Sequence, residues 1–152
     1  MKKLLYSFVM LFVAATLFVA CSDKSEDGPL ANPNPEKLVA GTYTGNWTRV
    51  LDKDTTTAPG QITVTADSAF IATFAVAKCA ELGLDEMSSK ANVTWQSNGG
   101  LRITNYGGAN NGFQTSFAGK LNADRTLSLN FKKTVKVGRK AYEYVFTFTG
   151  KQ

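Results

Sequence analysis

The feature that most constrains the fold is an alternation of apolar and polar residues that begins at Gly41 and continues to the end of the chain. Successive side chains of a β-strand point to opposite faces, so this period of two predicts strands with one buried face. We expect eight strands. Their inward residues are Tyr43, Gly45 and Trp47; Ile62 and Val64; Phe70, Ala72, Phe74 and Val76; Val93 and Trp95; Leu101 and Ile103; Phe113, Thr115, Phe117, Gly119 and Leu121; Leu127, Leu129, Phe131, Val135 and Val137; and Tyr142, Tyr144, Phe146 and Phe148.

Short connections between these runs favour an antiparallel arrangement in which each strand pairs with the next. Eight is the number of strands at which such a sheet closes into a barrel with a filled interior or a small ligand cavity. We therefore predict an all-β, eight-stranded antiparallel up-and-down barrel over residues 40–152, with a two-sheet β-sandwich as the alternative. Turn-forming residues are expected at 58–60, 66–68, 98–100, 122–124 and 137–139.

One connection, residues 78–90, drops the alternation and is long for a hairpin loop. It contains helix-forming residues interrupted by Gly83. We expect a short helix or Ω-loop that acts as a partial lid over one mouth of the barrel. In the alternative, Leu82, Leu84 and Met87 only plug the barrel end.

The first twenty residues indicate where the protein is located. Lys2 and Lys3 precede an apolar run that ends at Ala20, directly before Cys21. A basic start, an apolar stretch and a small residue before the cut are typical of a secretory signal peptide, and the run is shorter than the roughly 20 residues of a transmembrane helix. Cys21 resembles the acylated cysteine of a bacterial lipobox. We predict a cleaved signal over residues 1–20 and a membrane anchor of acyl chains such as palmitate at Cys21.

Residues 21–39 are expected to form the lipidated cysteine and a flexible tether, because they are rich in polar residues and proline. Ser22 stands where an aspartate would signal retention in the inner membrane, so we expect an outer-membrane lipoprotein. The acidic residues Asp23, Glu26 and Asp27 either resemble an export signal to the cell surface or form a solvated spacer.

Composition excludes several kinds of function. Once Lys2 and Lys3 leave with the signal peptide, 15 of the 17 basic residues remain against 12 acidic ones, an ordinary balance that does not indicate a nucleic-acid partner. The absence of histidine excludes Ser-His-Asp and Cys-His catalysis and the usual zinc and haem ligand sets. Cys79, the one other cysteine, is interpreted as a structural thiol.

Asp85 and Glu86 are adjacent in one loop, whereas glycoside hydrolysis needs two carboxylates that face each other across a cleft. We therefore expect a protein that is not an enzyme, is a monomer and has no metal or cofactor. Asp54-Thr55-Thr56 and Asp67-Ser68-Ala69 are similar to a bacterial O-glycosylation sequon, and both lie in expected turns.

The segments that open and close the expected barrel are VAGTYTGNW at residues 39–47 and FTFTG at 146–150. Both resemble the calycin-like lipoproteins of Gram-negative gut anaerobes. This resemblance implies a lipocalin- or avidin-like barrel over residues 39–150, with no common ligand. Gly45-Asn46-Trp47 is also similar to the G-x-W motif of lipocalins, although Lys151 stands where lipocalins have an arginine after the last strand.

Lys133 continues the inward register of Leu129 and Phe131. A buried ammonium group is costly unless it is paired, so we predict that Lys133 receives the carboxylate of an amphipathic ligand. The alternative is a bulge after Phe131 or a side chain that reaches solvent from the rim. The expected lining of the ligand cavity is Trp95, Phe117, Lys133, Tyr142 and Tyr144.

Two functions remain open. The first is a lipid-anchored barrel that binds a small apolar or amphipathic ligand or presents its loops at the cell surface. The second is a structural or accessory envelope subunit without an internal ligand, which docks a protein or an anionic glycan through its outer face. Its candidate contact is a basic hairpin formed by Lys132, Lys133, Lys136, Arg139 and Lys140.

Overall fold

The computed structural model describes residues 34–107 and 117–152. The expected signal peptide, Cys21 and the tether up to residue 33 lie outside the described residues, as do Phe113 and Thr115. Within the described part, no helix is long and apolar enough to cross a membrane.

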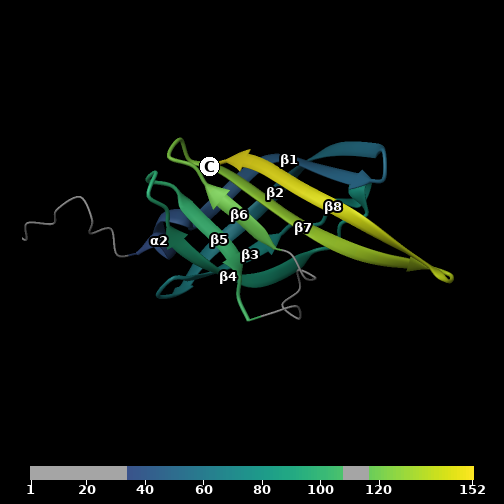
Figure 1. Cartoon of the computed structure of the whole chain (residues 1–152). Coiled ribbons are helices and arrows are strands. Elements are labelled where there is room, and N and C mark those ends of the chain that lie inside the picture. The colour runs from purple at the N-terminus through teal and green to yellow at the C-terminus, as the bar shows by residue number, and fades with distance from the viewer. Residues whose placement is uncertain (1–33, 108–116) are drawn as a thin grey trace, which may run out of the picture. The chain divides into compact units, whose positions relative to one another are not determined.

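The described chain is a closed barrel in which every strand pairs with its neighbours in sequence and the last strand pairs with the first (Figure 1). All these pairings are antiparallel, so the predicted up-and-down barrel is confirmed. The elements are α2 (Pro35–Val39), β1 (Gly41–Leu51), β2 (Asp54–Ser68), β3 (Ile71–Val76), the 3-10 helix η1 (Ala80–Leu82), β4 (Met87–Trp95), β5 (Leu101–Asn105), β6 (Ala118–Leu121), β7 (Thr126–Val137) and β8 (Lys140–Lys151).

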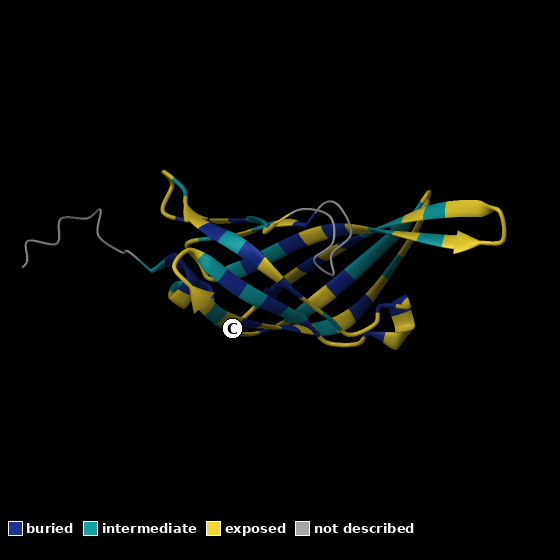
Figure 2. Cartoon of the chain, turned by 90° about the horizontal axis from the view of Figure 1, so that it is seen from below, coloured by how far each residue is buried: buried dark blue, intermediate teal, exposed yellow. Residues whose placement is uncertain are grey.

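The interior of the barrel is filled by the inward residues of the strands, and buried and exposed positions alternate along the ribbon (Figure 2). Trp47 is fully buried, and its indole lies edge-on to Phe131 at 5.6 Å and against Phe148 at 5.0 Å. Gly60 makes room for this indole, because a Cβ at position 60 would overlap Trp47 Cδ1. Each large apolar side chain buried in this way contributes roughly 1.5–3 kcal/mol to stability.

The helix α2 packs at one end of the barrel, against β2, β3 and β4. The Glu36 carboxylate accepts a hydrogen bond from the backbone N–H of Phe70, and the Tyr43 hydroxyl donates one to the Val39 carbonyl at 2.8 Å. Burial of the Tyr43 phenol raises its pKa. Residues 35–39, expected as the end of the tether, are therefore part of the barrel domain, since a buried Val39 removes apolar surface from water.

Two expected turns lie elsewhere. Residues 58–60 are inside β2, and the β1–β2 turn is formed at Asp52, whose φ is +50°. Pro59 is tolerated there because β3 pairs with β2 only from Ile62 onward, so the proline N atom interrupts no ladder with β3. Thr55 consequently lies in a strand rather than a turn. The turn expected at 66–68 follows Ser68, at residues 69–70.

Three residues expected inside the barrel are exposed: Phe70 by 50%, Trp95 by 38% and Val137 by 62%. Phe70 lies in the β2–β3 turn with a φ of +64°. Trp95 is the last residue of β4, and Val137 is the last residue of β7. All three lie at strand ends, where there is little opposite wall to cover an inward side chain.

β7 and β8 are longer than the strands beside them. Among the described residues, the pairing of β6 with β7 reaches Asn130 and the pairing of β1 with β8 reaches Val145. In the described part of the chain, residues 133–144 pair with each other alone and form a ribbon that extends past the barrel at the end away from α2 (Figure 1). We call this end the mouth.

Candidate functional site

The mouth of the barrel contains a partly open cavity of about 200 Å³. β1, β7, β8 and the segment around η1 contribute its walls. Its lining residues are Arg49, Leu82, Gly83, Lys133, Val135, Tyr144 and Phe146.

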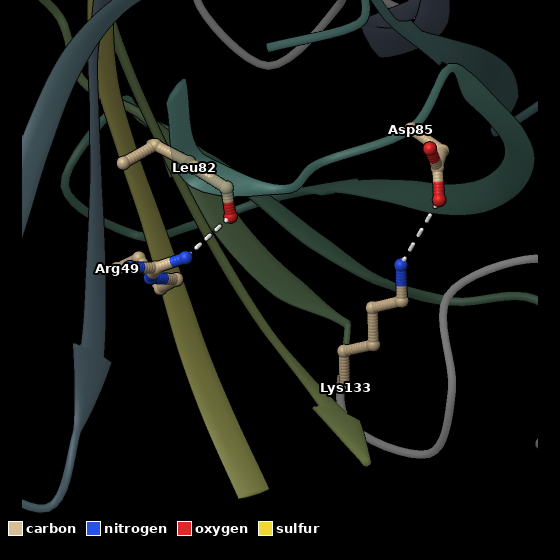
Figure 3. Close-up of polar contacts among 4 residues, drawn as sticks. All are labelled: Arg49, Leu82, Asp85 and Lys133. Atoms are coloured by element: carbon tan, nitrogen blue, oxygen red, sulfur yellow. Dashed lines mark hydrogen bonds and ion pairs between the residues drawn. The ribbon is translucent and has the colours of Figure 1, made fainter. Parts of the chain in front are cut away.

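Lys133 keeps its inward register, because β7 and β8 pair without interruption from Thr126 to Val137 and there is no bulge after Phe131. Its Nζ lies 3.4 Å from Asp85 Oδ2 (Figure 3). The Lys133 side chain is 28% exposed and the Asp85 side chain 78% exposed. An ion pair with so exposed a carboxylate stabilises the fold by at most about 1 kcal/mol, so a ligand anion can compete with Asp85 for Lys133.

Arg49 is a second cation in the cavity wall, and it is not among the residues predicted from the sequence to line the cavity. Its Nη1 donates a hydrogen bond of 2.9 Å to the Leu82 carbonyl (Figure 3), and its guanidinium carbon lies 5.5 Å from the centre of the Tyr144 ring. At this distance the guanidinium and the ring attract each other in a cation–π contact. The signal was present in the alternation: Arg49 is two residues beyond the inward Trp47, as Lys133 is two beyond the inward Phe131.

The segment around η1 forms one wall of the cavity. Cys79 and Leu84 form a β-bridge, with N–H to O distances of 2.8 and 3.0 Å in the two directions. Leu82 and Leu84 are buried, so the segment closes this end of the barrel. It also lines the cavity, through Leu82 and Gly83. It is shorter than the expected 78–90 connection, because β4 already begins at Met87.

The structure brings together two of the five residues predicted to line the cavity. Lys133 and Tyr144 are direct cross-strand partners and both line it. Tyr142 lies farther out along the ribbon. Phe117 is buried in the core, and Trp95 lies at the other end of the barrel. The last three are not among the lining residues.

The charged groups of the cavity are mainly cationic. Across residues 34–107 and 117–152, no group of three His, Cys, Asp or Glu side chains is placed to hold a metal ion. The cavity has two cations, Arg49 and Lys133, and Asp85 forms an ion pair with the second. Tyr144, Phe146 and Val135 supply an aromatic and apolar wall.

No match is found when the chain is compared with known protein families, with curated proteins or with solved structures. The ligand of the cavity is therefore inferred from the volume, the charged groups and the apolar lining of the cavity.

Proposed function

We propose that this protein is a calycin-like, lipid-anchored barrel of the outer membrane that binds a small amphipathic anion in its mouth. One observation carries the proposal: the inward ammonium group of Lys133 faces a cavity, and among residues 34–107 and 117–152 its ion-pair partner is the exposed carboxylate of Asp85. A ligand carboxylate replaces Asp85 at Lys133, while the apolar part of the ligand lies against Tyr144 and Phe146.

The volume of the cavity limits the ligand. A water molecule occupies about 30 Å³ of liquid, and a methylene group needs a similar space, so about 200 Å³ holds roughly six or seven non-hydrogen atoms. The barrel below the cavity is filled by buried aromatic rings such as Phe131 and Phe146. The ligand is therefore a short aliphatic acid of about four or five carbon atoms, and a longer acyl chain would extend into solvent.

Lys133 rather than Arg49 is the group expected to bind the carboxylate. The Arg49 guanidinium already donates to the Leu82 carbonyl and packs on Tyr144. A hydrogen bond between charged groups contributes about 1.5–3 kcal/mol, which corresponds to a change in affinity of roughly tenfold or more.

Calorimetric titration of the detergent-solubilised full-length protein with butyrate and valerate tests this function, with the matching neutral amides as controls. The acids should bind, and the amides should bind at least about tenfold more weakly. Lys133→Met should abolish the preference for the acid. Lys136→Met, on the exposed face of the same strand, should keep it. Equal binding of an acid and its amide, or unchanged binding by Lys133→Met, would contradict the proposal.

A second function, docking of another envelope component through the ribbon, is favoured by its exposed tip. Among the described residues Lys136, Arg139 and Lys140 form no ion pair, whereas Lys132 is paired with Glu143 at 2.8 Å. Replacing these three residues by glutamate should prevent docking, so that cross-links between the ribbon and the docked component are lost in intact cells. Unchanged cross-links would exclude the ribbon as the docking surface.

A further inference from the structure

Two adjoining hollows lie on the outer wall of the barrel, apart from the mouth cavity. One, of about 290 Å³, lies across β5, β6, β7 and β8, and the other, of about 400 Å³, lies between the β4–β5 and β6–β7 turns. Both are lined by Gln96 and Lys120, so together they form one elongated groove. We call this the outer groove.

Two cations face each other in the outer groove. Arg102 on β5 and Lys120 on β6 are direct cross-strand partners, and both are exposed. Like charges at such positions have Cβ atoms about 4.5–5.5 Å apart and destabilise the sheet. In the described part of the chain neither forms an ion pair with a carboxylate. A bound anion would offset this repulsion.

Amide side chains make up much of the remaining wall. Gln96 and Asn98 come from the β4–β5 turn, and Asn122 comes from the β6–β7 turn. The first turn is held by hydrogen bonds from Gly100 N–H to Asn98 Oδ1 at 3.1 Å and from Gln96 N–H to the Gly100 carbonyl at 2.9 Å. Side-chain amides offer both donors and acceptors, as the hydroxyl groups of a sugar require.

We propose that the outer groove binds an acidic oligosaccharide. A sugar carboxylate lies between Arg102 and Lys120, and hydroxyl groups of the neighbouring sugar units bond to Gln96, Asn98 and Asn122. A small inorganic anion would contact the two cations and leave the amide-lined hollow empty, so the length of the groove favours an extended ligand. The described lining residues include no aromatic ring, so affinity rests on charge and hydrogen bonds.

The test is calorimetric titration of the full-length protein with a galacturonic acid hexamer, its fully methyl-esterified form and inorganic phosphate. The hexamer should bind, and the neutral ester should bind at least about tenfold more weakly, because it has lost the charge-assisted hydrogen bonds. Lys120→Gln should weaken hexamer binding by about tenfold for the same reason. Lys53→Gln, in the exposed β1–β2 turn, is the charge-matched control and should bind as the parent protein does. Affinity should also fall as salt is raised, because both cations are exposed.

Asn122→Ala separates an oligosaccharide site from a site for any small anion. It should weaken hexamer binding several-fold and leave phosphate binding unchanged. Absence of hexamer binding, hexamer binding unaffected by Lys120→Gln, or phosphate binding as tight as that of the hexamer would each overturn the proposal. Lys133→Met should not change hexamer binding, so failure of the mouth site and failure of the outer groove are distinguishable.

Discussion

The Glu36 carboxylate accepts a hydrogen bond of 3.1 Å from the backbone N–H of Phe70, thirty-four residues later in the chain. This contact joins α2 to the β2–β3 turn, and the Glu36 side chain is almost fully buried. The turn holds Phe70 at a φ of +64°, a backbone conformation that is unfavourable for a bulky aromatic residue. The hydrogen bond therefore stabilises both the position of α2 and a strained turn.

Glu36→Ala should lower the free energy of unfolding by about 1 kcal/mol, because the Phe70 N–H loses its partner in a partly buried environment. Glu36→Gln keeps an acceptor oxygen and should lose less. Urea denaturation of both variants measures the difference. A smaller loss for alanine than for glutamine would show that the contact does not stabilise the fold.

Gly60→Ala should destabilise the barrel by about 1–3 kcal/mol, because the added methyl group overlaps the Trp47 indole in a filled core. The control is the double variant with Trp47→Phe, whose smaller ring gives the methyl group space. The two substitutions should cost less together than the sum of their separate effects. Strictly additive losses in thermal or urea unfolding would show that the two positions do not contact each other.

Asp124 should stabilise the folded state more at a pH above its ordinary pKa than at a pH below it. Its carboxylate accepts hydrogen bonds from Thr126 Oγ1 at 2.8 Å and from the Thr126 N–H at 3.0 Å, and these lower its pKa from 3.8. Because the pKa is lower in the folded state, the stabilisation is complete above pH 3.8 and is lost as pH falls through the folded-state value.

The variant Asp124→Asn has no such titration. The stability difference between the parent protein and this variant should therefore be constant near neutral pH and shrink below about pH 4. Urea unfolding between pH 2.5 and 7 measures it. A difference that grows on acidification would contradict the assigned direction.

Cys21→Ser should release the protein from the membrane, because the expected acyl chains at Cys21 are its predicted anchor. Phase partitioning of cell extracts in detergent should move the variant to the aqueous phase. Cys79→Ser is the control: the Cys79 thiol is buried, and its substitution should leave the protein in the detergent phase. A Cys21→Ser variant that stays with the detergent would exclude the lipid anchor.

The amino-acid sequence by itself determined that the chain forms antiparallel strands with one apolar face, whereas the closure of the sheet into a barrel rather than a sandwich is shown by the pairing of β1 with β8. A period of two requires strands with one apolar face, and short turns leave antiparallel neighbours as the simplest pairing. The inward register was also predictable, which is why Lys133 was recognised as an inward cation. Most of the predicted interior, including Trp47 and Phe148, is buried.

Only the tertiary structure decided how far along the barrel axis each inward residue lies. Alternation specifies the face of a residue but not its distance from the barrel end, so Trp95 was expected beside Lys133 although the two lie at opposite ends. It also decided the contacts that close the mouth. Arg49 meets the Leu82 carbonyl thirty-three residues later because the barrel closes and brings β1 to the η1 segment. No local pattern specifies such a contact, since it depends on the stagger between strands that closure imposes.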